Sequence, residues 1–367
     1  MARTTLWFRQ FDFWLLGAIT LLVGLGMLVI FSTTVSDEGY RSINVQGLAL
    51  VLGIFVLSFL SALDYRYLKN LSYILYVLTI VVLVLLLFFG KTVKGTTGWF
   101  NLGFIQVQPS EFAKVTMLLV LARYFSWCVG RPSRLQFVIV SGILVGIPTI
   151  ITMLQPEFGS ALLLVFMWLG MLLFTGIKRN YVIALVVVFL VTALLGWNFF
   201  LQDYQKERIM TFMQPQDDPL GAGWNMNQAI IAVGSGGLIG RGLGEGSQSQ
   251  LDFLPEQHTD FIFAVIAEEL GLVGTLAVII LFAFLLYRML RIAYRARDDF
   301  GLMLAIGASV LLIAQITLNI GMNLGILPIA GVPLPLVSSG GSALLAMMMI
   351  FGILQSVIIR HKGVVFK

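Results

Sequence analysis

Charged residues and cysteine are scarce in this sequence. Of its 367 residues, 11% are charged and 59% are hydrophobic, whereas about a quarter of the residues in a soluble domain are charged. This composition excludes water as the main solvent, because lipid must cover most of such a surface. The single cysteine, Cys128, excludes an internal disulfide and a cysteine metal cluster.

Several common catalytic signatures are also missing. The sequence contains no HExxH, GxSxG or Walker motif. Its two histidines, His258 and His361, lack the partners and the spacing of a zinc site. The net charge of +5 is explained by cytoplasmic loops that suit an anionic lipid surface, so no nucleic-acid partner is expected.

Long apolar runs are abundant instead. Each is near 20 residues, which is enough for a helix to cross the hydrocarbon core. We count ten such runs, approximately at residues 13–31, 44–63, 71–89, 109–126, 136–154, 159–176, 181–201, 270–290, 301–324 and 340–359. They predict an all-α polytopic membrane protein with one integral membrane domain over residues 1–367, whose first helix is retained and not cleaved as a signal peptide.

The basic residues predict the orientation of these helices, because Lys and Arg are retained on the cytoplasmic side. When both termini are placed in the cytoplasm, 16 of the 23 basic residues lie in or near cytoplasmic loops. That placement leaves four of the 18 acidic residues inside: Asp12, Asp64, Asp298 and Asp299. Carboxylates that could transfer protons are therefore concentrated on the outer side.

Three stretches interrupt the plain membrane pattern. Residues 202–269 form a long outer loop between helices seven and eight, and long structured loops are usually functional. Residues 325–341 contain three prolines and four glycines, which cannot form a continuous helix. Because unsatisfied backbone is costly in lipid, this second stretch should pack against protein or line a wet cavity. The third stretch, residues 90–108, joins helices three and four.

Asp260 is the first candidate for catalysis. It ends the polar loop within the run FLPEQHTDFIFAVIAEELG and directly precedes an apolar stretch. A carboxylate at a boundary between water and hydrocarbon is partly desolvated, which suits a general base. The alternative is a helix N-cap, since Thr259 and Asp260 are both good capping residues. Of the following pair, Glu268 and Glu269, we expect one to face inward.

Glu111 and Lys114 are a second candidate site. They lie three residues apart on one face of a helix that should begin at Pro109 or Ser110. Charged groups within the membrane normally point into the bundle or a water-filled cavity. The pair could contact the substrate, or it could be an ion pair that only fixes the packing.

The outer loop and its neighbours supply further candidates. Arg208 could bind a diphosphate or extend to the lipid headgroups, and Gln228 lies in the same loop. The glycine-rich run 234–246 does not match a nucleotide-binding loop, and it is better interpreted as a close approach of backbone to a ligand or helix. Trp99 on its own is typical of an interfacial aromatic residue.

Four motifs together resemble the SEDS family, whose members act in bacterial shape, elongation, division and sporulation. They are KGTTGWFNLGFIQVQPSEFAK, AVGSGGLIGRGLGEGSQSQL, FLPEQHTDFIFAVIAEELG and NIGMNLGILPIAGVPLPLVSSGGS. The resemblance covers essentially the whole chain in the right order. Length and short tails are most similar to the elongation branch, RodA, and the division branch, FtsW, shares the same motifs.

The resemblance implies a peptidoglycan glycosyltransferase of the bacterial cytoplasmic membrane that polymerises lipid II on the outer face. Asp260 matches the essential aspartate of the family, which would take the proton from the sugar 4-hydroxyl in an inverting reaction. Lys114 and Glu111 match its intramembrane charged pair, and the implied substrate-binding set also includes Arg208, Gln228, Trp99 and His258. Arg208 or a divalent cation, magnesium or manganese, would neutralise the undecaprenyl diphosphate leaving group. The implied partner is a class B penicillin-binding protein, a transpeptidase.

Several positions depart from the family pattern. Gly98 stands where the family often has Arg, and Glu157 stands where Asp is common. Leu336 and Ser339 replace a frequent Phe and Tyr. The glycine weakens any role for a cation beside Trp99, whereas Glu157 conserves the charge.

Two other classes of function compete with the enzyme. A flippase for lipid-linked precursors would also use broken segments and intramembrane charges, although the sequence shows no inverted repeat. A non-catalytic scaffold of a cell-wall synthesis complex is the third class. Polymerisation of lipid II by purified protein would distinguish the enzyme from both.

Overall fold

The computed structural model describes residues 10–34, 41–93, 96–101, 106–128, 135–195, 206, 210–213, 222–251 and 253–361. The predicted site residue Arg208 and the end of the predicted span 181–201 lie outside these residues. The described helices are α2 (Phe13–Thr34), α3 (Arg41–Ala62), α4 (Tyr65–Phe89), α5 (Pro109–Cys128), α6 (Leu135–Leu154), α7 (Phe158–Phe174), α8 (Arg179–Leu195), α10 (Ala222–Ser235), α11 (Ser247–Gln250), α12 (Ile262–Arg295), α13 (Asp299–Asn323) and α14 (Gly341–Ile359).

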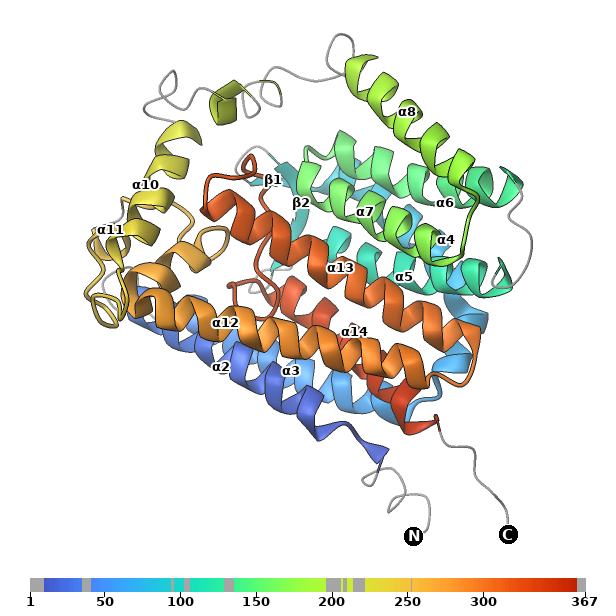
Figure 1. Cartoon of the computed structure of the whole chain (residues 1–367), viewed down its shortest axis with the longest axis horizontal. Helices are drawn as coiled ribbons and strands as arrows, with labels where there is room; N and C mark the ends of the chain where they lie inside the picture. The colour runs from blue at the N-terminus through green and yellow to red at the C-terminus, as the bar shows by residue number, and fades with distance from the viewer. Residues whose placement is uncertain are drawn as a thin grey trace.

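The helices form an elongated bundle of the predicted polytopic, all-helical class (Figure 1). Among the described residues, seven helices are long and apolar enough to cross a membrane. The other three predicted spans coincide with α5, which carries three charged residues, and with the shorter α7 and α8. The number of ten spans therefore stays a prediction. The start of α2 and the end of α14 lie at one end of the bundle, and α10 and α11 lie at the other (Figure 1).

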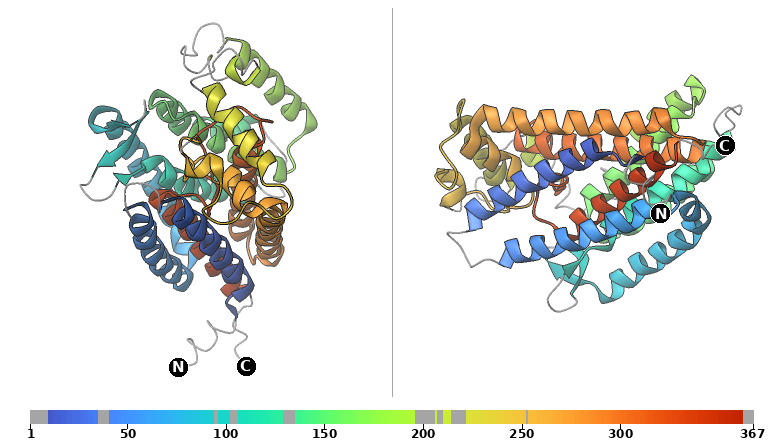
Figure 2. Two further views of the ribbon diagram at one scale, coloured as in Figure 1. Left: turned by 90° about the vertical axis from the view of Figure 1, so that its left-hand side faces the viewer. Right: turned by 90° about the horizontal axis from the view of Figure 1, so that it is seen from below.

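Helices α13 and α14 form the centre of the bundle. In their most apolar stretches, 67% and 83% of the residues are buried within the protein, compared with 22% in α4. Helix α4 therefore faces lipid, and α8 leans away from the bundle (Figures 1 and 2). A helix that is apolar on all sides can be surrounded by lipid or by protein, and α14 is surrounded mostly by protein.

Residues 90–108 contain a small antiparallel sheet, which the helical apolar pattern did not predict. Its strands are β1 (Lys91–Val93), β2 (Thr96–Asn101) and β3 (Gln106–Val107), in the order β1-β2-β3. The Thr, Val, Trp and Phe residues of this stretch favour strands. Helix α5 begins at Pro109 as predicted, where the ring suits the first helical position.

The predicted outer loop ends earlier than residue 269, and the helix predicted over 270–290 exists but is longer at both ends. Helix α12 begins at Ile262 and continues to Arg295, with a break at Gly271, whose φ is 65° and ψ −161°. The amides of Arg241 and Gly242 donate to the carbonyls of Glu268 and Glu269, each at 3.0 Å. The glycine-rich loop thus satisfies the backbone at the break, and α10 and α11 form part of the rest of the predicted loop.

The proline-rich stretch 325–341 packs inside the protein, as predicted. Val332 and Val337 are 1% and 0% exposed. A Cβ at Gly26 of α2 would overlap the Val337 carbonyl, and one at Gly159 of α7 would overlap the Ala330 carbonyl. Two helices therefore approach this irregular backbone closely because each presents a glycine to it.

Candidate active site

Asp260 lies at the end of a tight turn directly before α12. The amides of Thr259, Asp260 and Phe261 all donate to the carbonyl of Glu256, at 3.1, 3.1 and 3.3 Å. The N-cap of α12 is Phe261, with no side-chain capping hydrogen bond. The interpretation of Thr259 or Asp260 as the N-cap residue of this helix is therefore wrong.

Side chains from distant segments hold the backbone of this turn. The amide nitrogens of Asn319 and Asn323 on α13 both donate to the Asp260 carbonyl at 3.0 Å. The Ser338 hydroxyl donates to the Thr259 carbonyl at 2.6 Å. Asn323 also accepts a hydrogen bond from the amide of Ala264 at 3.0 Å. These bonds fix the backbone from which the Asp260 side chain extends, and catalysis depends on such positioning.

Sequence reasoning missed these positioning residues. Asn319 and Asn323 are completely buried, and they lie four residues apart on one face of an otherwise apolar helix. Buried amides in such a helix need partners. Two asparagines at a spacing of four in an apolar helix therefore could have indicated these residues from the sequence.

The predicted site residue His258 also lies in this turn. Its Nδ1 is 2.9 Å from the Thr33 hydroxyl of α2, and its carbonyl accepts from the amide of Ser339 at 2.8 Å. His258 thus joins the outer end of α2 to the stretch 325–341. Its predicted contact with substrate stays a prediction.

Glu111 and Lys114 form a closed ion pair on α5. The Lys114 Nζ donates to Glu111 Oε1 at 2.6 Å, and the two side chains are 2% and 3% exposed. A buried pair of this kind resists the loss of either partner, because a single charge would remain unpaired. Both a contact with substrate and a purely structural role are compatible with this geometry.

Glu157 lies next to this pair and fills the space that Gly98 leaves. Any Cβ at Gly98 would overlap Glu157 Oε1, which accepts from the Gln108 amide at 3.2 Å. Among the described residues, Glu157 Oε2 has no hydrogen-bond partner. Burial raises the pKa of the Glu157 carboxyl, the Gln108 hydrogen bond opposes the rise, and the nearby Glu111 carboxylate adds to it. The two positions that depart from the family pattern are therefore in direct contact.

Trp99 lines a cavity of about 350 Å³ between α3 and the small sheet. Its wall includes Phe112 of α5, together with Ser339 and Gly340. Ser339 lines this cavity, and its amide donates to the His258 carbonyl. One residue of the cavity wall is therefore bonded directly to the turn that contains Asp260. The predicted residue Gln228 does not line it. Gln228 is 8% exposed in α10.

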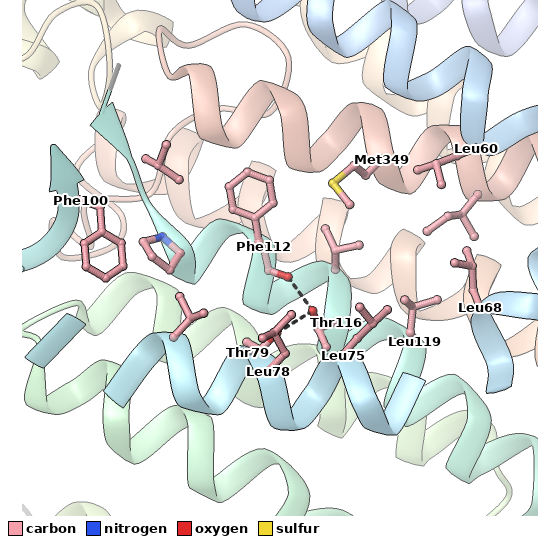
Figure 3. Close-up of a pocket in the computed structure, with 15 residues that line it drawn as sticks. Leu60, Leu68, Leu75, Leu78, Thr79, Phe100, Phe112, Thr116, Leu119 and Met349 are labelled. Carbon is pink, nitrogen blue, oxygen red and sulfur yellow. Dashed lines mark hydrogen bonds between the residues drawn. The ribbon is translucent and has the colours of Figure 1, made fainter. Parts of the chain in front are cut away.

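A second cavity, also of about 350 Å³, is apolar and adjoins the first (Figure 3). Val107 and Phe112 line both cavities. The hydroxyl of Thr79 donates to that of Thr116 at 3.0 Å, and Thr116 donates to the Phe112 carbonyl at 3.1 Å. Because the polar atoms of the wall bond to one another, the surface left for a ligand is hydrocarbon.

Glu268 and Glu269 are both buried, whereas one was expected to face inward. Glu268 accepts from the amides of Gln248 and Ser249 at 2.8 and 3.1 Å. Glu269 accepts from the Ser32 hydroxyl at 2.7 Å and the Gly244 amide at 3.1 Å. Both carboxylates therefore anchor the glycine-rich loop and α11 to the bundle.

The carboxylates of the described residues do not gather into a metal-binding set. No three His, Cys, Asp or Glu side chains lie close enough there to hold an ion. One or two carboxylates together with the phosphates of a substrate are the usual ligands of Mg²⁺, and the divalent cation that the resemblance implies stays a prediction.

Comparison with known proteins places this architecture in a family. A model of the FtsW/RodA/SpoVE cell cycle protein family matches residues 11–363. The chain is 41% identical over 335 residues to the peptidoglycan glycosyltransferase MrdB of Escherichia coli K12, covering 91% of this chain and 90% of that protein. It is 30% identical over 426 residues to the peptidoglycan glycosyltransferase RodA of Treponema pallidum, covering 96% and 98%.

Solved structures agree with these sequence relationships. A chain from a peptidoglycan synthase complex that coordinates polymerization and crosslinking matches with a TM-score of 0.83 and 29% identity, over 96% of this chain and 99% of that one. The crystal structure of the rod shape determining protein RodA of Thermus thermophilus matches with a TM-score of 0.70 and 27% identity, over 95% and 96%. The chain is thus a multi-pass protein of the bacterial inner membrane, and it belongs to the FtsW/RodA/SpoVE family, also called SEDS.

Proposed function

We propose that this protein is a peptidoglycan glycosyltransferase that polymerises lipid II on the outer face of the membrane during cell elongation. The observation that carries the proposal is the restrained turn that presents Asp260, in a chain 41% identical to a protein with that name. The similarity to a rod shape determining protein supports the elongation role.

In the proposed reaction, the Asp260 carboxylate is the general base. It takes the proton of the acceptor sugar 4-hydroxyl as that oxygen attacks the anomeric carbon of the donor. The bond from this carbon to the diphosphate oxygen breaks, undecaprenyl diphosphate leaves, and the anomeric configuration inverts. A positioned base of this kind typically contributes about 10² to 10⁴ in rate.

The two adjoining cavities supply the proposed binding site for the lipid chain. The apolar cavity fits hydrocarbon, and its neighbour leads past Trp99 and Phe112 toward Ser339. A prenyl chain in this path would bring its diphosphate toward the turn of Asp260. Arg208, Gln228, His258 and the Glu111–Lys114 pair remain proposed contacts of the headgroup.

The proposal is tested with purified protein and fluorescent lipid II. Asp260→Asn, which preserves shape and removes the base, is expected to lower the rate of glycan synthesis at least about 100-fold with an unchanged melting temperature. Glu245→Gln removes an exposed outer-loop carboxylate and should retain the wild-type rate. Full polymerisation by Asp260→Asn would exclude the general-base role. Lipid II that crosses vesicle membranes without polymerising would favour the flippase.

We also propose a class B penicillin-binding protein as partner, because the similar solved chain belongs to a complex for polymerization and crosslinking. The partner would dock on the lipid-facing helices and outer loops and stimulate a weakly active enzyme. Equal rates of glycan synthesis with and without the transpeptidase would refute this regulation.

A further inference from the structure

A cavity of about 550 Å³ lies at the opposite end of the bundle from Asp260. The start of α2, the last turns of α12 and the end of α14 line it. This is the end at which α2 starts and α14 ends (Figure 1), and the orientation predicted from the basic residues puts it at the cytoplasmic leaflet. None of the candidate catalytic residues takes part in it.

Asp12 is the one carboxylate that lines this cavity, and it is already neutralised. Both Nε and Nη2 of the buried Arg288 donate to Asp12 Oδ2. The second oxygen, Oδ1, accepts from the amide of Leu15 at 3.0 Å, and Gln355 bonds to the Asp12 backbone on both sides. Arg288 therefore has a structural role, and the charge of the Asp12 carboxylate is balanced by this ion pair.

Arg291 and Arg295 supply the net charge of the cavity. With Arg288 they recur at intervals of three and four residues, which places all three on one face of α12. Within the described residues, no carboxylate forms an ion pair with Arg291 or Arg295. His361 also lines the cavity. Two guanidinium groups without acidic partners thus face a space large enough for a phosphate group and part of its substituents.

The rim of the cavity has the character of a membrane interface. Phe13 and Trp14 are 56% and 70% exposed at the entrance, and the Trp14 ring packs edge-on against Phe284. Exposed aromatic rings of this kind mark the level of the lipid headgroups. The basic cavity therefore opens where a headgroup lies, beside apolar surface on which acyl chains can run.

We propose that this cavity binds the headgroup of an anionic phospholipid from the cytoplasmic leaflet. Arginine is the side chain best suited to a phosphate, because its planar donors match two phosphate oxygens. Basic pockets between membrane helices on the cytoplasmic side bind lipid headgroups in this way. The aromatic and apolar rim favours a lipid over a soluble anion, which would gain nothing from it.

Native mass spectrometry of the full-length protein tests the proposal, with phosphatidylglycerol and phosphatidylcholine as the probes. We expect the wild-type protein to retain phosphatidylglycerol preferentially. The double variant Arg291→Gln/Arg295→Gln should lower this preference by about tenfold or more. The double variant Arg291→Lys/Arg295→Lys keeps the charge and should retain most of the preference. Unchanged melting temperatures would show that both variants fold.

Arg297→Gln is the matched control, because Arg297 is exposed at the same end of the bundle but does not line the cavity. It should leave the lipid preference unchanged. Equal retention of both lipids by the wild type, or an equal loss in Arg297→Gln, would overturn the proposal. Displacement of the lipid by inorganic phosphate would show that the cavity binds a soluble anion. If neither phospholipid nor phosphate bound, the cavity would be a contact site for a protein segment. Both results would also overturn it.

Discussion

At the scale of single residues, Gly98 and Glu157 show how two positions far apart in the sequence depend on each other. Considered separately, the glycine looked like a lost cation and the glutamate like a neutral exchange of one acid for another. The structure places the Glu157 carboxyl where a side chain at position 98 would begin. The longer acid is accommodated because the neighbouring position has no Cβ.

Gly98→Ala should therefore destabilise the protein by about 1–3 kcal/mol, the usual cost of overpacking. Adding Glu157→Asp to this variant shortens the acid and should restore part of the stability. Thermal unfolding of the two single variants and the double variant measures the coupling, which should exceed about 0.5 kcal/mol. Simple additivity of the two substitutions would contradict the shared space.

Glu157 should also make the stability of the protein depend on pH. Its pKa is raised above 4.5 in the folded state, chiefly by burial, so the folded protein binds this proton more tightly than the unfolded chain does. The contribution of Glu157 to stability is therefore fully present below about pH 4.5 and is lost as the pH rises through the raised pKa. Melting temperatures across this range should fall less steeply for Glu157→Gln.

Glu245→Gln serves as the control for this titration, because Glu245 is exposed in the outer loop. It should keep the wild-type dependence on pH. A Glu157→Gln protein with the same slope as the wild type would show that another group is responsible.

At the scale of elements, the break in α12 joins the glycine-rich loop to the segment that leads to Asp260. Gly271 has a backbone conformation that is essentially limited to glycine, and a Cβ there would overlap the backbone of Leu238 and Gly240. The loop can approach this closely because both sides present backbone. The glycines of the run 234–246 thus allow the backbone of this loop to approach a helix closely. The sequence had left open whether the loop approaches a helix or a ligand.

Gly271→Ala should release this loop from α12. The strained conformation alone costs about 1–3 kcal/mol, and the overlap adds to it. Hydrogen exchange should increase at the amides of Arg241 and Gly242, which bond to α12 carbonyls in the wild type.

Gly234→Ala is the matched control for the loop. A Cβ at Gly234 would meet nothing within 4 Å, and alanine favours the helix α10 by about 0.5–1 kcal/mol. Its loop amides should exchange as in the wild type. Unchanged exchange in Gly271→Ala would show that the loop does not depend on this contact.

At the scale of the whole molecule, charge decides the orientation in the membrane. In a Cys128→Ala background, a Glu245→Cys variant should react with a membrane-impermeant maleimide in intact spheroplasts. An Arg297→Cys variant should react only after permeabilisation, because the basic residues keep its loop in the cytoplasm. The reverse pattern of labelling would invert the topology and move Asp260 to the wrong side of the membrane for the proposed reaction.

The membrane character, the approximate positions of the apolar helices and the candidate Asp260 could all be predicted from the amino-acid sequence. These depend on local composition and length, since lipid selects apolar segments one at a time. The sequence did not predict the sheet at 91–107 or the extension of α12, because short strands and a broken helix depend on their neighbours.

The restraints on the Asp260 turn became visible only in the folded protein. Its carbonyl is restrained by Asn319 and Asn323, 59 and 63 residues further along the chain, and the turn is restrained again by Ser338. Hydrogen bonds at such separations follow from how the helices pack, and no periodicity in the sequence encodes that packing. The basic cavity at the cytoplasmic end has the same origin, because three helix ends must meet before Arg291 and Arg295 can share one space with Asp12 already neutralised.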